Sequence, residues 1–284
     1  MPTRLGQNFL KDMEVVKKII ASANLSTDDF VIDIGPGEGV LTAALAERAG
    51  KVLAIELDDK LIAPLKKRFS ADKNIEIIHG DILKINLSGL IKNQKQQTKN
   101  YKVIANIPYY ITSKIIRQFL EAEIPPKEMI LMVQKEVAER IVALPREIPA
   151  VGRDAKRILR GRPGQMSILA VSVQYYADAE ILFAVGKESF SPVPEVDSAV
   201  IRISHIVERG SPDTEEATQF FRTVKAGFSA KRKTLANNLS NGLHMDKSTA
   251  EAAIKKIGLK PNVRAQEISI EHWKNLAAIT KTKS

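Results

Sequence analysis

The sequence contains no cysteine among its 284 residues. This absence excludes a disulfide framework, thiolate metal sites, cysteine nucleophiles and iron–sulfur clusters, and it fits a reducing cytosol. The four histidines, His79, His205, His244 and His272, also lack the spacing of metal ligands. We therefore predict that the chain binds no metal and does no thiol chemistry.

Long apolar runs are absent as well. No window approaches the roughly 18 uninterrupted apolar residues that a membrane-spanning helix needs, and residues 1–20 lack the apolar core of a signal peptide. Asp12 and Glu14 argue against an acid-poor transit peptide. We expect a soluble, cytoplasmic protein that has no membrane partner.

Acidic residues are too few to balance the basic ones. The chain has 43 lysines and arginines against 33 aspartates and glutamates, which gives a formal charge of +10 and a pI of about 9.6. Such a field attracts polyanions, so nucleic acid is the first partner to test and an anionic membrane surface the second. An indifferent basic surface is the remaining alternative. At 44% hydrophobic and 27% charged, the composition supports a large core and excludes a disordered or coiled-coil chain.

Short apolar runs alternate with amphipathic stretches between Phe30 and Ala143. The predicted strands cover Phe30–Ile34, Lys51–Ile55, Ile75–His79, Lys102–Ala105 and Met129–Val133. The predicted helices between them cover Leu41–Ala49, Asp59–Phe69 and Ser113–Glu121. Alternation of strand and helix predicts a doubly wound α/β domain, in which helices cover both faces of a parallel sheet.

The pattern changes after residue 143. Residues 144–165 combine prolines, glycines and basic residues, so we expect a long exposed connection there. Two further strands and three helices are predicted over Ile168–Tyr176, Ser198–Ser204, Glu215–Ala226, Lys231–Leu239 and Ser248–Ile257. We place the domain boundary near Ile206, which gives a catalytic α/β domain over residues 1–205 and a smaller helical domain over residues 206–284.

A glycine-rich turn, Asp33-Ile-Gly35-Pro-Gly37-Glu-Gly39, follows the first predicted strand. Glycine is needed where a backbone turns sharply and must approach a bound group that a Cβ would exclude. Gly35 and Gly37 are therefore candidate cofactor contacts. The alternative for this turn alone is tight packing of a strand on a helix.

Two carboxylates end the next predicted strands. Glu56, 21 residues after Gly35, can accept both ribose hydroxyls of a nucleoside-containing cofactor. Asp81 can accept an adenine amino group, although an N-cap of the next helix is the alternative for that residue. A nicotinamide dinucleotide meets the ribose condition too, but its pyrophosphate would face Glu38 and Asp33. These charges repel a diphosphate and suit a sulfonium cation bearing an amino group, so we favour S-adenosylmethionine over NAD.

The sequence Asn106-Ile107-Pro108-Tyr109 ends the fourth predicted strand. An exocyclic base amine is a poor nucleophile because its lone pair is delocalised into the ring. Hydrogen bonds to the Asn106 side-chain oxygen and to a neighbouring carbonyl, for which Ile107 is the candidate, would pull that nitrogen towards tetrahedral geometry. Pro108 fixes the turn, and Tyr109 offers a face on which a flipped base stacks. We take Asn106, Pro108 and Tyr109 as candidate catalytic residues; an Asx-Pro turn with a buried tyrosine is the alternative.

These segments together resemble the ribosomal RNA adenine-N6 dimethyltransferase family, and above all its small-subunit branch. The resemblance also rests on Gly6-Gln7-Asn8-Phe9-Leu10, Ser189-Phe190-Ser191-Pro192-Val193-Pro194-Glu195-Val196-Asp197-Ser198 and Phe228-Ser229-Ala230-Lys231-Arg232-Lys233-Thr234-Leu235. It implies a Rossmann-like methyltransferase domain. It further implies S-adenosylmethionine contacts from Asn8, Leu10, Gly35, Glu56, Asp81 and Asn106, with Asn106 and Tyr109 also holding the target adenine.

The family's reaction places two methyl groups on N6 of each of two adjacent adenines, in a hairpin near the 3′ end of small-subunit rRNA. The resemblance implies this reaction here, on an assembling small subunit rather than on free RNA. The alternatives are a large-subunit rRNA adenine-N6 methyltransferase of the antibiotic-resistance type, an assembly checkpoint factor with secondary methylase activity, and a nicotinamide oxidoreductase. Two features depart from the family pattern: the 144–165 connection is longer, and Tyr110 stands where asparagine is common.

Basic residues without acidic neighbours occupy the stretch from Ala217 to Met245, and they are Arg222, Lys225, Lys231, Arg232 and Lys233. Phosphates attract such clusters without regard to sequence, so these residues would position rRNA while the pocket selects the base. A solvated helix start is the alternative. Trp273 lies on a C-terminal helical pattern and is predicted to be a core residue. We expect a monomer.

Overall fold

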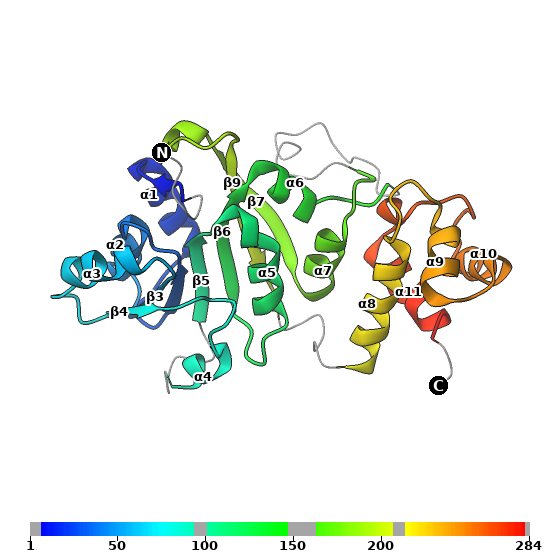
Figure 1. The fold of residues 1–284 in the computed structure, drawn as a ribbon, viewed down its shortest axis with the longest axis horizontal. Helices are drawn as coiled ribbons and strands as arrows, with labels where there is room; N and C mark the ends of the chain where they lie inside the picture. Colours follow the sequence, from blue (N-terminus) through cyan, green and yellow to red (C-terminus); the bar gives the residue numbers. More distant parts are fainter. Residues whose placement is uncertain (1–6, 94–100, 147–162, 207–213, 282–284) are drawn as a thin grey trace. The chain divides into compact units, whose positions relative to one another are not determined.

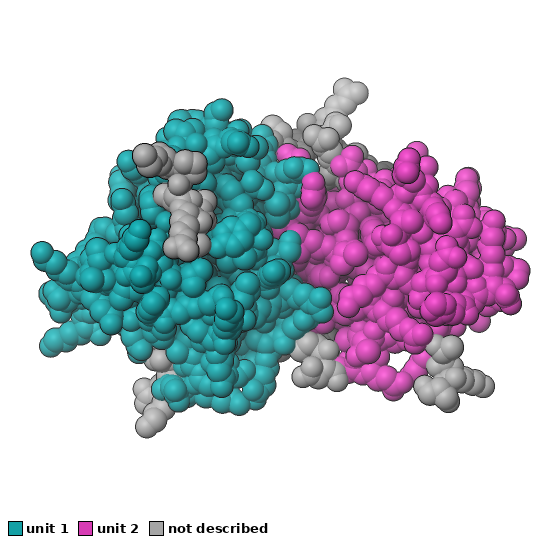
Figure 2. Space-filling view, in the orientation of Figure 1, with its two compact units in different colours: residues 1–138, 178–207 teal, residues 139–177, 208–284 magenta. Residues whose placement is uncertain are grey.

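The computed structural model describes residues 7–93, 101–146, 163–206 and 214–281. The chain forms two compact units (Figure 2), the first from residues 1–138 and 178–207 and the second from residues 139–177 and 208–284. The predicted boundary near Ile206 lies beside the last of these divisions. Residues 139–177 cluster with the second unit, a division that the sequence pattern does not predict.

A seven-stranded sheet with the order β4-β3-β2-β5-β6-β9-β7 is the centre of the first unit (Figure 1). Its strands in chain order are β2 Phe30–Ile34, β3 Lys51–Glu56, β4 Ile75–His79, β5 Tyr101–Asn106, β6 Glu128–Gln134, β7 Asp178–Val185 and β9 Ser198–Ser204. Strands β2 to β6 pair in parallel, whereas β9 runs antiparallel to β6 and β7. The predicted α/β fold is confirmed, and so are the parallel strands predicted between Phe30 and Ala143; β9 lies outside that stretch and adds an antiparallel strand. Parallel neighbours are usually joined by a crossover helix, and residues 186–197, which link β7 to β9, contain no α-helix.

The central strands are buried on both faces, which explains their continuous apolar sequences. Every residue of β2 is buried, and so is every residue of β3 after Lys51. Helices α1 Met13–Ala23 and α2 Val40–Ala46 pack on one face, in a cluster that includes Ile19, Leu45, Val31 and Ile104. Helix α5, Thr112–Leu120, buries Ile115, Ile116, Phe119 and Leu120, and it lies in front of the sheet in Figure 1.

The remaining helices of the first part of the chain are short. They are α3 Asp59–Arg68, α4 Leu87–Lys92, the 3₁₀ helix η1 Tyr109–Ile111, α6 Lys135–Ile141 and the 3₁₀ helix η3 Lys187–Ser189. Helix α3 begins at the N-cap Asp58, whose carboxylate accepts the backbone N–H of Lys60.

A separate two-stranded sheet joins two distant motifs of the sequence. Strand β1, Phe9–Leu10, pairs antiparallel with β8, Phe190–Ser191. The carbonyl of Ser189 accepts the backbone N–H of Lys11 at 2.9 Å. The N-terminal motif is thereby held by the segment that precedes β9.

Residues Ile168–Tyr176 form helix α7 and not the predicted strand. Their β-branched and aromatic side chains favour a strand locally. However, Ser167 caps the helix by accepting the backbone N–H of Ala170, and Gln174 donates to the carbonyls of Ile141 and Ala143. Tertiary packing on several sides of this helix outweighs the local preference, and the strand β7 follows it instead.

The second unit also contains α8 Glu215–Gly227, α9 Leu235–Leu243, α10 Lys247–Lys256, the 3₁₀ helix η4 Ala265–Glu267 and α11 Ile270–Ile279. Helix α9 starts later than predicted, because Thr234 is its N-cap and residues 231–233 form a turn. Trp273 is fully buried and stacks on Phe228, as expected of a core residue. Of the predicted 144–165 connection, residues 147–162 lie outside the described residues. None of the described helices has the length and apolar character needed to span a bilayer.

Candidate active site

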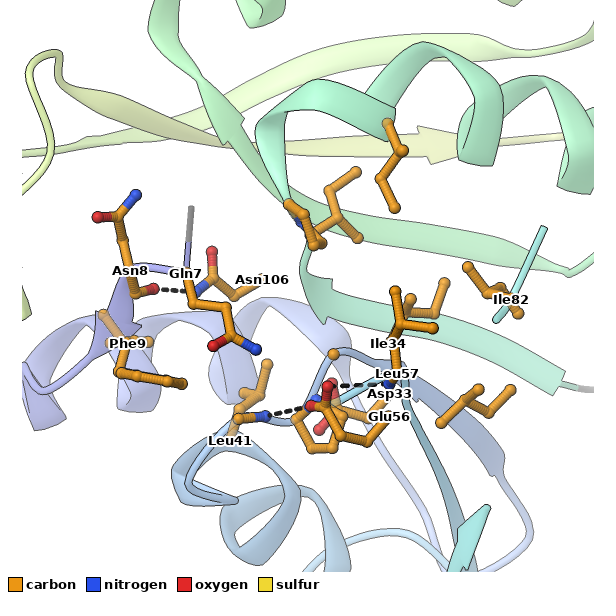
Figure 3. Close-up of a pocket in the computed structure, with 18 of the residues that line it drawn as sticks. Gln7, Asn8, Phe9, Asp33, Ile34, Leu41, Glu56, Leu57, Ile82 and Asn106 are labelled. Carbon is orange, nitrogen blue, oxygen red and sulfur yellow. Dashed lines mark hydrogen bonds between the residues drawn. The ribbon is translucent and has the colours of Figure 1, made fainter. Parts of the chain in front are cut away.

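One pocket opens at the carboxyl ends of β2, β3, β4 and β5 (Figure 3). In the sheet, β3 and β4 follow on one side of β2 and β5 lies on the other. The strand order reverses at this point, which is where open α/β sheets bind ligands. All predicted cofactor and catalytic residues line the pocket, and these are Asn8, Leu10, Gly35, Gly37, Glu56, Asp81, Asn106, Pro108 and Tyr109.

The glycine-rich turn needs its glycines for two physical reasons. Gly35, Gly37 and Gly39 adopt φ values of 66°, 59° and 80°, in the left-handed region that side chains disfavour. A Cβ on Gly37 would lie 2.7 Å from the Phe9 ring. The turn can therefore pass beneath strand β1 only because this position has no side chain.

Glu56 ends β3 and is only 3% exposed. One oxygen, Oε1, accepts the backbone N–H groups of Leu57 and Asp58 at 2.9 and 2.8 Å, and Oε2 accepts that of Gly37 at 3.1 Å. Burial raises the pKa of Glu56, and these three hydrogen bonds oppose that shift. They also fix the carboxylate beside the glycine-rich turn.

Asp33 is the most deeply buried acid of the pocket, with 1% of its surface exposed. The Thr42 hydroxyl donates to its Oδ2 at 2.6 Å. Burial raises the pKa of Asp33 to about 7; the Thr42 hydrogen bond lowers it, and the nearby charge of Glu56 raises it. This carboxyl is therefore poised to ionise when a cation arrives.

Asp81 follows β4 and does not cap a helix. Its Oδ1 accepts the backbone N–H of Leu83 at 3.0 Å, whereas the next helix, α4, has Asn86 as its N-cap. The N-cap alternative is therefore wrong. The Asp81 carboxylate holds a turn and also lines the pocket.

The lining is acidic. Four of its residues, Asp33, Glu38, Glu56 and Asp81, carry carboxylates, and the described lining contains no lysine, arginine or histidine. The described residues also contain no group of three or more metal-binding side chains placed to hold an ion. A site of this charge attracts a cation and repels a diphosphate.

Asn106 ends β5 with its side-chain amide held in one orientation. Its Nδ2 donates to the backbone carbonyl of Asn8 at 3.2 Å, as the dashed line in Figure 3 shows. The amide oxygen is thereby the atom left to accept from a ligand. Tyr109 lies in η1, and its hydroxyl shares a 2.6 Å hydrogen bond with the Ser198 hydroxyl. Burial raises the pKa of Tyr109, so the phenol stays neutral near pH 7.

Several residues of the site are absent from the sequence prediction. Leu57 and Ile82 directly follow the predicted Glu56 and Asp81 and add apolar wall to the pocket, so their adjacency was a usable signal. Thr42 and Ser198 act through partners 9 and 89 residues away, and no local pattern indicates such contacts.

The predicted RNA-binding residues belong to the second unit and are not part of the pocket lining. All five side chains are exposed, and they are Arg222, Lys225, Lys231, Arg232 and Lys233. The first two lie on α8, and the other three form the turn before α9. We call residues 231–233 the basic turn. Asn238 anchors it by donating to the carbonyls of Gly227 and Ala230 at 2.6 and 3.0 Å.

The sheet order and the pocket together define a Rossmann-like methyltransferase fold, and two solved structures agree. A dimethyladenosine transferase from Plasmodium falciparum superposes with a TM-score of 0.72 at 25% identity, covering 94% of this chain and 95% of that one. The 23S rRNA methyltransferase ErmE superposes with a TM-score of 0.69 at 26% identity, covering 97% of this chain and all of that one.

The profile described as "Ribosomal RNA adenine dimethylase" matches residues 1–147 and 152–282. A protein of Dehalococcoides mccartyi named ribosomal RNA small subunit methyltransferase A is 41% identical over 97% of this chain and 87% of its own length. A protein of the same name from Geobacillus thermodenitrificans is 38% identical over 96% of this chain and 88% of its own length. The chain belongs to the ribosomal RNA adenine dimethylase family.

Proposed function

We propose that this protein uses S-adenosylmethionine to dimethylate N6 of two adjacent adenines in a hairpin near the 3′ end of small-subunit rRNA, within an assembling subunit. The observation that carries the proposal is one pocket lined by Glu56, Asp81 and Asn106. The relatives named for the small subunit reach 41% identity, whereas ErmE, named for 23S rRNA, reaches 26%. This difference favours the small subunit as the substrate.

The charge of the pocket supports S-adenosylmethionine as the cofactor. A sulfonium and an ammonium suit a lining with four carboxylates and, in its described residues, no basic side chain. Oε2 of Glu56 keeps a lone pair for a ribose hydroxyl, because each carboxylate oxygen can accept two hydrogen bonds and Oε2 accepts only one backbone N–H, whereas Oε1 already accepts two. We assign Asp81 as the acceptor of the adenine amino group, with Leu57 and Ile82 as apolar residues of the same lining. The same carboxylates would repel the pyrophosphate of NAD.

The chemistry of the bound cofactor is simple. When bound, S-adenosylmethionine would supply a methyl group activated by a positively charged sulfur, and that sulfur would leave with the electrons of the carbon–sulfur bond. The protein must align the incoming amine and make it a better nucleophile. We assign that task to Asn106, Pro108 and Tyr109.

Asn106 accepts one N6 hydrogen through Oδ1, because its Nδ2 is already committed to the Asn8 carbonyl. The Pro108 carbonyl accepts from the Ile111 backbone N–H and the Thr112 hydroxyl, which leaves Ile107 as the second acceptor of the motif. Two fixed acceptors draw the amine towards tetrahedral geometry. After transfer, N6 is acidic enough to release its proton to water, so no general base is required.

Five of the exposed basic residues of the second unit supply the phosphate contacts that the acidic pocket cannot. Their side chains bind without reading sequence, so they position the rRNA while the pocket selects the base. We assign Arg222 and Lys225 on α8 and the basic turn to this role.

A methyl-transfer assay on small subunits that lack the modification tests the proposal. Labelled S-adenosylmethionine and primer-extension mapping should locate the label at two adjacent adenines near the 3′ end, with no label on large subunits. Label on the large subunit would support the antibiotic-resistance-type alternative. No transfer to either subunit, or no calorimetric binding of the cofactor and its demethylated product, would contradict the proposal.

A further inference from the structure

The hydroxyl of Tyr109 is held by a residue that no motif of the catalytic turn predicts. It shares a 2.6 Å hydrogen bond with the hydroxyl of Ser198, which lies 89 positions further along the chain. Ser198 is fully buried, whereas Tyr109 is half-buried and lines the pocket. The contact therefore joins an inaccessible side chain to a ring that faces the ligand site.

Ser198 is fixed by the sheet. It is the first residue of β9, which lies between β6 and β7, and it pairs with Gln134 on one side and Val185 on the other. The ladders on both sides hold its backbone in place, and burial of the whole residue restricts the movement of its Oγ. Tyr109, by contrast, stands at the start of the 3₁₀ helix η1, directly after the proline turn.

We infer that Ser198 is a positioning residue for methyl transfer, which holds the Tyr109 ring at the tilt that a stacked adenine needs. This inference rests on the proposed function. A tyrosine fixed only at its backbone can swing about its side-chain bonds, but a second attachment at the hydroxyl stops that motion. A base stacked on the ring inherits the ring's tilt, and alignment of reacting atoms is where small misplacements cost rate.

The segment that carries Ser198 also holds a second part of the pocket lining. Its strand β8 pairs with β1, whose residues Phe9 and Leu10 line the pocket. The Ser189 hydroxyl donates to the carboxylate of Asp12 at 3.0 Å, just after β1. The segment from Ser189 to Ser198 thus braces the cofactor side at one end and the base side at the other.

Two substitutions remove the same hydrogen bond from opposite ends. Ser198→Ala removes the anchor and Tyr109→Phe removes the hydroxyl while keeping a ring for stacking. We expect each to lower the rate of transfer at saturating subunit and cofactor by about five- to tenfold, the range of one net hydrogen bond. The double variant should be no slower than either single variant, because both changes break one contact.

Ser204→Ala is the matched control, since it makes the same change at the other end of β9. It should leave the rate unchanged. The assay uses the full chain, unmethylated small subunits and labelled S-adenosylmethionine. The KM for subunits and the calorimetric Kd for the cofactor should stay within about twofold in every variant, because neither phosphate nor cofactor contacts change. A role limited to stability would lower the active fraction and shift cofactor binding as well.

The outcomes separate the inference from the proposed function. A wild-type protein that transfers no methyl group overturns the proposed function and the inference with it. A wild-type protein that methylates, with Ser198→Ala as fast as Ser204→Ala, overturns only the inference. Defects that multiply in the double variant, or a Tyr109→Phe defect far larger than that of Ser198→Ala, also overturn it. The latter would mean that the hydroxyl acts on the substrate itself.

Discussion

The pocket and the basic turn select their ligands in opposite ways. Glu56 is 3% exposed and is fixed by three backbone N–H groups, and Asp33 is 1% exposed and bound to Thr42. The basic turn is exposed at all three of its side chains. A buried, prearranged site selects a ligand by shape and hydrogen-bond pattern, whereas an exposed cluster selects only by charge. Chemistry and RNA attachment should therefore be separable by substitution.

The loss of Asn106 should produce the largest effect and the cleanest separation. With Asn106→Ala we expect transfer to small subunits to fall about a hundredfold or more, as when one preorganised polar group is removed from a reaction centre. Subunit binding should stay within about twofold, because it depends on phosphate contacts. Labelled-methyl rates and filter binding measure the two properties on the same preparation.

Loss of subunit binding in Asn106→Ala would show that the two regions act as one, and a wild-type rate would remove Asn106 from the mechanism. Growth gives a further reading of this variant. A strain that carries it and grows normally would favour the assembly-checkpoint alternative. A defect equal to deletion of the gene would count against that alternative.

The basic turn should give the reverse result. We expect the triple substitution of residues 231–233 by alanine to reduce the slope of log affinity against log salt by about 2, since each phosphate contact on single-stranded RNA contributes about 0.7. The cofactor Kd should not change. Subunit affinity over a range of salt concentrations measures the slope.

Its matched control removes the same charge from α10, through Lys247→Ala, Lys255→Ala and Lys256→Ala. These three lysines are exposed and lie in the same unit. If both triple variants weaken binding equally, overall charge rather than the basic turn carries the interaction.

The fold was predictable where one local pattern decides the structure. Strands Phe30–Ile34 and Ile75–His79 match β2 and β4 to the residue, because short segments rich in Ile, Val and Phe between turns favour strands. Ile168–Tyr176 fails because its side chains are buried on several sides of a helix, which erases the helical periodicity.

The position of pocket residues at the ends of strands was predictable, because each follows a recognisable strand in the sequence. The contacts that orient them, Asn106 with Asn8 and Tyr109 with Ser198, span 98 and 89 positions and exist only in the folded chain.

Acidity should affect the pocket and spare the basic turn. Asp33 has a pKa of about 7, and a bound cation favours its ionised form. Below that pKa the carboxyl is neutral and must lose a proton when the cation binds. We expect cofactor affinity to fall by up to about tenfold per pH unit below 7, and little above it. Calorimetry between pH 6 and 7.5, in two buffers with different protonation enthalpies, measures affinity and proton release together.

Asp33→Asn is the control for this dependence. It should bind the cofactor more weakly at pH 7.5 and lose most of the change between pH 6 and 7.5. A wild-type Kd that is flat over this interval would show that Asp33 does not respond to the cation. Subunit affinity of the apoprotein should not follow the same curve, because Asp33 lines the pocket and is not part of the basic turn.

Tyr110 shares features of both regions, since it belongs to the pocket but is exposed. Its substitution should have the smallest effect on the rate of methylation. It lines the pocket yet is 61% exposed, directly after the half-buried Tyr109. An exposed ring at the mouth of a base pocket can stack on the nucleotide beside the target. We expect Tyr110→Asn to slow methylation of the second adenine by about fivefold, near the lower limit of one base-stacking contact. Tyr110→Phe, which keeps the ring, should behave as wild type, and a time course of primer-extension stops at each adenine resolves the two rates. Equal slowing at both adenines would instead mean that Tyr110 contacts the target adenine itself, as we propose for Tyr109. Both tyrosines of the 3₁₀ helix would then belong to the selective pocket.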